Sequence, residues 1–176
     1  MKERKVFILC GQAFSGKSTL SKQLADIYKA KIIGRDEIYF SIEKLLAFEN
    51  TPEDDDDALW ENLWPLVTQG LKNNLLLGNS VIIDDNCLRL QQRDELRSIA
   101  REASVKNTLI YFDVPSEILR ARKEENKKTK LRHDVPSAWL DDDAKIFERP
   151  TEDEEPIIFE PSIALDDLID IIRARE

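Results

Sequence analysis

The chain has 176 residues, of which 41% are hydrophobic and 35% are charged, and its formal net charge is −9 at pH 7. This length fits one domain better than two and allows a buried core. The acidic balance argues against a protein that coats nucleic acid, and the two cysteines and single histidine show no zinc-ligand spacing. No apolar run approaches the roughly 20 residues that cross a bilayer, and the apolar start is too short for a signal peptide, so a cytoplasmic protein is expected.

The first predicted strand is the apolar, β-branched run Val6–Cys10, which stops at a glycine. The segment GQAFSGKST follows it and fits the pattern G-x-x-x-x-G-K-[ST] in full, and helical spacing then continues over residues 18–28. A loop of this composition wraps a phosphate with its backbone N–H groups, so glycines stand where side chains would block the approach. The helix after it points its N-terminus at the anion.

Each residue type in this segment has a chemical task, so we predict that ATP and Mg²⁺ are the cofactors. The Lys17 ammonium is expected to reach the β- and γ-phosphates and to act in catalysis, and the Ser18 hydroxyl is expected to ligate Mg²⁺. The residues predicted to bind the nucleotide are Gly11, Gln12, Ala13, Phe14, Ser15, Gly16, Lys17, Ser18 and Thr19.

A short strand over residues 31–34 and a helical pattern over 37–48 come next, separated by Arg35 and Asp36. A carboxylate near the γ-phosphate can accept the proton of an attacking hydroxyl, so Asp36 is a candidate general base. It is equally a candidate N-cap of the following helix, and sequence position alone favours the cap.

An acidic run, Glu53–Asp57, precedes an apolar helical pattern over residues 59–71. Acidic residues in a first turn complement the helix dipole, and a cation site is the alternative interpretation. Pro65 is expected to kink or divide this helix. Trp60 and Trp64 share one helical face, which indicates packing, or alternatively the lining of a substrate cleft.

The third predicted strand, residues 81–84, ends in two acids, Asp84 and Asp85. This is where a carboxylate beside a magnesium ion belongs, and Asp84 is favoured because it comes first. Cys87 has no base beside it in the sequence and is interpreted as structural.

The rest of the chain reads as a helix over 91–104, a strand over 108–114, a helix opened by Ser116, a helix from Ser137 to about 148, a strand over 156–159 and a helix over 165–173. Strands that alternate with helices predict a parallel sheet covered on both faces. The fold class is therefore a three-layer α/β fold of the P-loop nucleotide-kinase type. We expect one domain over 1–176, with a helical insertion on the substrate side at about 37–78 and a lid at about 123–136.

Residues 119–133 are predominantly basic, whereas the rest of the chain is acidic. A mobile basic lid would stabilise the charge that spreads over a transferred phosphoryl group and would exclude water. A solvated helix end and a groove for a nucleic-acid backbone are the alternatives. The basic residues are Arg120, Arg122, Lys123, Lys127, Lys128, Lys130 and Arg132.

Taken together, these segments resemble the P-loop kinase family, an AAA-type group that includes the kinase half of phage polynucleotide kinase, zeta-toxin-like kinases and antibiotic-phosphorylating kinases. The resemblance rests on GQAFSGKST, RDEI, VIIDD, Arg93, YFDVPSEILRAR and FERPTEDEE. It implies that Asp36 is the base that activates the acceptor hydroxyl and that Arg122 stabilises the transferred phosphoryl group.

The chain departs from this family at two places. Asn126 stands where a second lid arginine is usual, and Lys127, Lys128 or Arg132 is the candidate substitute. Asn86 and Cys87 stand where the family commonly has threonine and asparagine after the strand-ending acid.

Three functions stay open at this point. The first is transfer of the γ-phosphate of ATP to a hydroxyl of a small molecule, which the acidic composition favours. The second is a 5′-hydroxyl polynucleotide kinase, and the third is an ATPase or regulatory module without an acceptor. A GTPase is disfavoured, because the segment NKKT has Thr129 where guanine recognition needs an aspartate. The identity of the acceptor and the oligomeric state cannot be read from the sequence.

Overall fold

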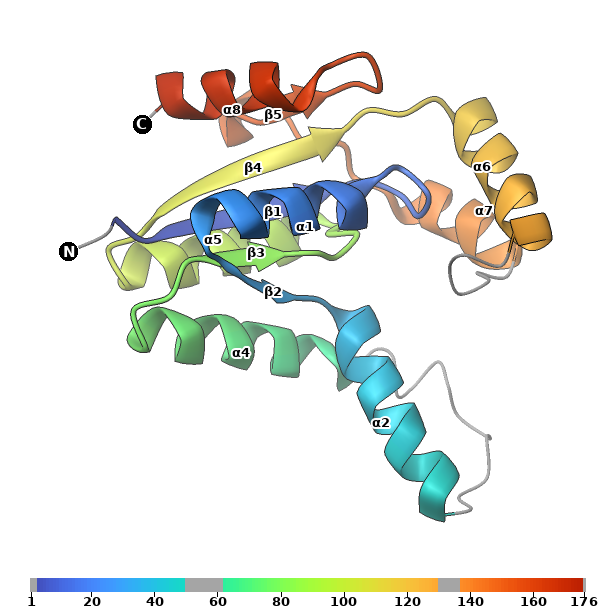
Figure 1. Cartoon of the computed structure of the whole chain (residues 1–176), viewed down its shortest axis with the longest axis horizontal. Coiled ribbons are helices and arrows are strands. Elements are labelled where there is room, and N and C mark those ends of the chain that lie inside the picture. The colour runs from blue at the N-terminus through green and yellow to red at the C-terminus, as the bar shows by residue number, and fades with distance from the viewer. Residues whose placement is uncertain (1–2, 50–61, 130–136, 176) are drawn as a thin grey trace.

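A five-stranded parallel sheet organises the chain (Figure 1), in a computed structural model that describes residues 3–49, 62–129 and 137–175. The strand order is β2-β3-β1-β4-β5, and every neighbouring pair is parallel. The bounds are Lys5–Cys10 for β1, Lys31–Ile33 for β2, Val81–Ile83 for β3, Lys106–Phe112 for β4 and Ile157–Phe159 for β5. The predicted α/β fold class is confirmed.

Two helical layers cover the sheet. Helices α1 (Lys17–Tyr28) and α8 (Leu165–Ala174) pack on one face, and α4 (Trp64–Leu76) and α5 (Leu90–Glu102) pack on the other. The central strand β1 contributes Phe7 and Leu9 to the first face and Val6, Ile8 and Cys10 to the second. Both faces of a parallel sheet are buried, which is why this strand is apolar throughout.

The remaining helices lie beyond the carboxyl ends of the strands. They are α2 (Arg35–Glu49), α6 (Ser116–Thr129) and α7 (Ser137–Ile146), and Figure 1 shows all three on the arrowhead side of the sheet. A small apolar cluster of Phe14, Leu119 and Leu140 joins the loop after β1 to α6 and α7. Ligands of open α/β sheets bind at this edge.

Not every detail follows the sequence-based expectations. Helix α2 begins at Arg35 and the Ile38 N–H donates to the Gly34 carbonyl, so Asp36 lies in the first turn and its N-cap interpretation is wrong. Pro65 lies in the first turn of α4, where its missing N–H costs nothing, and a turn at Leu63 separates α4 from the helical residue Asn62, which agrees with the expected division of the helix. Trp60, the run Glu53–Asp57 and residues 130–136 lie outside the described residues.

The first residues of the predicted lid, 123–129, belong to helix α6. Helix α6 continues through Thr129, because lysine, arginine and glutamate are good helix formers even without an apolar stripe. Its surface lysines pair within the helix, Lys127 with Glu124 at 2.7 Å and Lys128 with Glu125 at 3.7 Å. Within the described residues, no helix is long and apolar enough to span a membrane.

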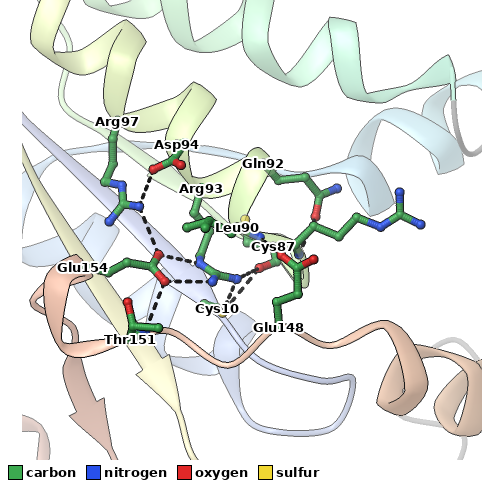
Figure 2. A network of polar contacts seen from close by, with 11 residues as sticks. Cys10, Cys87, Leu90, Gln92, Arg93, Asp94, Arg97, Glu148, Thr151 and Glu154 are labelled. Carbon is green, nitrogen blue, oxygen red and sulfur yellow. Dashed lines mark hydrogen bonds and ion pairs between the residues drawn. The ribbon is translucent and has the colours of Figure 1, made fainter.

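A buried ion-pair network ties the C-terminal segment to α5 (Figure 2). Arg93 is fully buried, and its Nε and Nη2 donate to the two carboxylate oxygens of Glu154 at 2.7 and 2.9 Å. Arg93 Nη1 also donates to the Cys87 carbonyl at 3.0 Å. Arg97 Nη2 and the Thr151 N–H donate to the same carboxylate, each at 3.1 Å. Glu154 lies in the short 3₁₀ helix Glu152–Glu154 (η1), so this network fixes the chain just before β5.

We expect Glu154→Ala to lower the free energy of unfolding by about 3–5 kcal/mol, because it leaves the Arg93 guanidinium buried without its countercharge. Glu152→Ala, at an exposed position of the same turn, is the matched control and should change stability little. Urea denaturation of the three proteins measures the difference. Equal stability of the Glu154 and Glu152 variants would contradict a structural role for the ion pair.

Candidate active site

The segment of residues 11–19, here called the phosphate-binding loop, lies at the carboxyl end of β1. Gly11 has φ +152° and Gly16 has φ +108°. A Cβ atom on Gly11 would lie 2.9 Å from Phe112 Cβ, so the close approach of β4 excludes any side chain there. Gly16 precedes the first turn of α1, whose free N–H groups favour an anion.

Lys17 lies inside this loop. Its Nζ donates to the carbonyls of Gly11 at 2.8 Å and Gln12 at 2.9 Å, and the side chain is buried. Burial lowers the pKa of the ammonium below its ordinary value, and the carboxylates of Asp84 and Asp85 act against that lowering. An ammonium held in this way is ready to meet a phosphate at the loop.

The Ser15 hydroxyl is buried and finds no hydrogen-bond partner among the described residues. An orphaned donor beside Gly11 and Gly16 fits a ligand that supplies acceptor oxygens, and phosphate is such a ligand. The loop therefore fits the polyphosphate that its sequence predicts.

Asp84 directly follows β3, and its carboxylate faces α1. Its Oδ1 accepts a hydrogen bond from the Ser18 hydroxyl at 3.4 Å, and its Oδ2 accepts one from the Ser21 hydroxyl at 2.8 Å. A hydroxyl and a carboxylate so placed are the oxygen ligands that Mg²⁺ prefers. The structure thus brings together the two residues that the sequence singled out as the metal side of the site.

Asp85 points elsewhere and forms a buried ion pair with Arg35. The guanidinium donates from Nε at 2.8 Å and Nη2 at 2.6 Å, and the Arg35 N–H adds a third bond at 3.3 Å. Burial alone would raise the pKa of Asp85, but Arg35 holds it below its ordinary value. The Arg35 guanidinium also lies 5.7 Å from the ring centre of Trp64, within cation–π range. This pair joins the start of α2 to the end of β3.

The turn before α2 lies directly against the end of β3. A Cβ atom on Gly34 would lie 2.2 Å from the Asp84 carbonyl oxygen, so only glycine fits this approach. Asp36 follows two residues later. Although its side chain is exposed, nearby protein atoms raise its pKa, as does the charge of Asp85, while Lys17 opposes the rise. A carboxyl with a raised pKa close to an ammonium has the properties of a general base.

Arg122 reaches the phosphate-binding loop from α6. Its Nη1 donates to the carbonyls of Phe14 and Ser15, both at 3.0 Å. A cavity of about 440 Å³ opens beside it, between α1, α6 and the segment after β5. Its lining combines apolar side chains, among them Leu20, Phe159 and Pro161, with polar ones that include Gln23 and Asn126, so it offers both a surface for a flat ring and groups that can hydrogen-bond to it. Asn126, at the place of a second lid arginine, thus lines the cavity.

Sequence reasoning missed Asp143 of α7. The Asn86 amide donates to Asp143 Oδ2 at 3.0 Å and so links α7 to the segment after β3. Partial burial raises the pKa of Asp143 to about 6, against the opposing charges of Lys17 and Arg35. No motif marks this residue, because the two partners are 57 positions apart in the sequence. Cys87 is buried with a strongly raised pKa, which agrees with a structural thiol.

Comparison with known proteins identifies the relatives of this chain. Residues 6–150 match the family described as an AAA domain. The chain is 29% identical over 144 residues to the xylose import ATP-binding protein XylG of Histophilus somni, and spans 28% of that protein's length.

Solved structures share the fold over nearly the whole chain. Kti12 of Chaetomium thermophilum, in complex with ADP-AlF3, has a TM-score of 0.74 at 13% identity, with coverage of 97% of this chain and 96% of that one. A gluconokinase from Sinorhizobium meliloti has a TM-score of 0.62 at 19% identity, with coverage of 97% and 90%. At these identities the likeness describes the arrangement of strands and helices.

Proposed function

This chain belongs to the AAA domain family with a P-loop kinase fold, and on that premise we propose that it transfers the γ-phosphate of ATP to a hydroxyl group of a small molecule. The observation that supports this most is the convergence of Lys17, Asp84 and Asp36 at the carboxyl edge of the sheet. A phosphate-binding group, a metal-side carboxylate and a candidate base are the parts that phosphoryl transfer to an alcohol needs.

The chain's own residues divide the work of binding. The phosphate-binding loop and the Lys17 ammonium hold the polyphosphate, and the cavity beside Arg122 holds the nucleoside. Ser18 and Asp84 would hold Mg²⁺, which neutralises phosphate charge when bound. Arg122, fixed on the loop carbonyls next to Gly16, adds positive charge where the phosphates lie.

Asp36 supplies the acid–base chemistry in this proposal. Its carboxylate accepts the proton of the acceptor hydroxyl as the oxygen attacks the γ-phosphorus, while the bond from that phosphorus to the bridging oxygen breaks and ADP leaves. The Arg35–Asp85 ion pair positions the first turn of α2 and therefore Asp36. The acceptor lies on the α2 side of the loop, within the helical segment expected at about 37–78, and α6 begins the lid.

A nucleotide-binding module without an acceptor is the second candidate, because Kti12, which shares this fold, was solved in complex with ADP-AlF3 alone among the ligands that its description gives. Asp36 favours the kinase, since a simple ATPase switch needs no base for an alcohol. A 5′-hydroxyl polynucleotide kinase is the third candidate, and Lys127 and Lys128 of α6, which pair with glutamates of the same helix, give it little support.

A transfer screen with γ-labelled ATP and Mg²⁺ tests the proposal. We expect labelled product from one class among sugars, nucleosides, amino sugars and 5′-hydroxyl oligonucleotides, and no label transfer by Lys17→Ala. Hydrolysis of ATP without any labelled product across the panel would support the ATPase instead. Labelled oligonucleotide ends would support the polynucleotide kinase.

A further inference from the structure

Helix α6 is attached to the phosphate-binding loop by a polar contact and by an apolar one. In the polar contact, Arg122 Nη1 donates to the carbonyls of Phe14 and Ser15, both at 3.0 Å. In the apolar contact, Leu119 of α6 is 4% exposed and packs in one cluster with Phe14 and with Leu140 of α7. Residues three apart lie on the same face of a helix, so both attachments belong to the face of α6 that meets the loop.

Phe14 has a backbone conformation that depends on its surroundings. Its φ is +64°, in the left-handed region that a bulky side chain rarely enters. Such a conformation persists where the surrounding structure fixes it, and the Phe14 side chain is 9% exposed, buried in the cluster with Leu119 and Leu140. The burial of Phe14 therefore helps to fix the loop carbonyls that Arg122 contacts.

The place of the Arg122 guanidinium depends on how α6 is held. Its Nη1 lies 3.9 Å from the position that a Cβ atom on Gly16 would occupy, and the side chain lines the cavity beside the loop. Arg120 of α6 also pairs with Asp141 of α7 at 3.6 Å, but both side chains are largely exposed, and such pairs contribute little. The buried cluster is therefore the stronger link between the loop and the two helices.

From this arrangement we propose that Leu119 is a positioning residue: its packing in the cluster holds α6 on the phosphate-binding loop and so places the Arg122 guanidinium at the γ-phosphate. The inference rests on the proposed function. Leu119 is not among the described residues that line the cavity, so it acts through Arg122 and not on the nucleotide itself. A shift of about 1 Å in a group that contacts the reacting phosphate is enough to cost much of its effect.

Calorimetric titration with ADP and with AMPPNP, each with Mg²⁺, tests this proposal. The ratio of the two dissociation constants, here called the AMPPNP preference, reports the contacts of the third phosphate. We expect Arg122→Ala to lower this preference about tenfold, as the loss of a charge-assisted hydrogen bond implies. Leu119→Ala should lower it about fivefold through misplacement of Arg122. Ile118→Ala, at an exposed position of α6, is the control and should keep the wild-type preference.

The double variant Leu119→Ala/Arg122→Ala distinguishes positioning from a general loss of packing. If Leu119 acts through Arg122, the double variant should lose about tenfold, no more than Arg122→Ala alone, whereas independent effects would multiply to about fiftyfold. Leu119→Met keeps the apolar volume and should restore most of the preference. Leu140→Ala opens the same cluster from α7 and should act in the same direction, so it tests the proposal even if Leu119→Ala does not fold.

Two results would overturn the proposal: a multiplied loss in the double variant, or a wild-type AMPPNP preference in Leu119→Ala or in Arg122→Ala. Failure of the proposed function would look different. A wild-type protein that bound neither nucleotide would contradict the phosphate-binding loop itself, and this inference with it. Hydrolysis of ATP without transfer would remove the acceptor from the proposed function, and the role of Leu119 would still be decided by the AMPPNP preference.

Discussion

Lys17→Ala is expected to lower kcat/KM for ATP by about 100-fold or more. Lys17 is the only residue of the phosphate-binding loop with a side-chain cation, and its Nζ lies within the loop itself, 2.8 Å from the Gly11 carbonyl. Removing it leaves the negative charge of the phosphates without the ammonium that the fold holds in place. Fluorescence titration with a labelled adenine nucleotide, together with steady-state turnover, measures both parts of the loss.

Two further variants make this result interpretable. Lys17→Met keeps most of the buried volume but removes the charge, so it should lose activity like the alanine variant while retaining thermal stability. Lys72→Ala removes an exposed lysine from α4 and should behave like the wild type. If Lys17→Met bound and turned over ATP normally, residues 11–19 would not be a phosphate-binding loop.

Asp36→Asn is expected to reduce kcat for transfer about 10²–10⁴-fold while nucleotide affinity stays within about twofold. The amide keeps the size and the hydrogen-bonding oxygen of the side chain but cannot accept a proton. Asp36 lies in the first turn of α2 and touches none of the loop carbonyls that hold Lys17, so nucleotide binding should survive. Single-turnover transfer to the acceptor found in the labelled-ATP screen separates chemistry from binding.

The pH dependence of transfer gives an independent check on Asp36. A base must be ionised to act. Nearby protein atoms and the charge of Asp85 raise the pKa of Asp36, so the rate should climb with pH through a limb above the ordinary value of 3.8. That limb should vanish in Asp36→Asn. Asp26→Asn, an exposed carboxyl of α1, serves as the control and should keep the full profile. An unchanged rate in Asp36→Asn would assign the base to another group.

The order of elements and the phosphate-binding loop were predictable because their signals are local. The apolar run before Gly11 forms β1, and the residues after Gly16 form α1, as the spacing predicted. The sequence could not decide firmly which of Asp84 and Asp85 lies on the magnesium side, since both follow the same strand. Successive side chains of extended backbone point to opposite sides, so one acid meets Ser18 and Ser21 and the other meets Arg35.

Other parts of the site depend on contacts between distant segments, which sequence patterns do not record. Asp143 meets Asn86 only after α7 has folded back over the sheet edge. In the sequence, Gly34 resembles any glycine that ends a strand, yet only glycine fits there because the Asp84 carbonyl, just after the neighbouring strand β3, lies so close. The sequence did not predict that residues 123–129 are helical, because the last two turns of α6 have no apolar stripe.

The buried ion pair between Arg93 and Glu154 limits where a recombinant version of this domain can end. The family match ends at residue 150, whereas the carboxylate that balances Arg93 belongs to Glu154, and β5 with its covering helix follows. A recombinant fragment that ends at residue 150 would leave the buried Arg93 guanidinium without its countercharge. It would also expose the edge of β4, because β5 would be missing. Expression boundaries for this protein therefore belong downstream of α8.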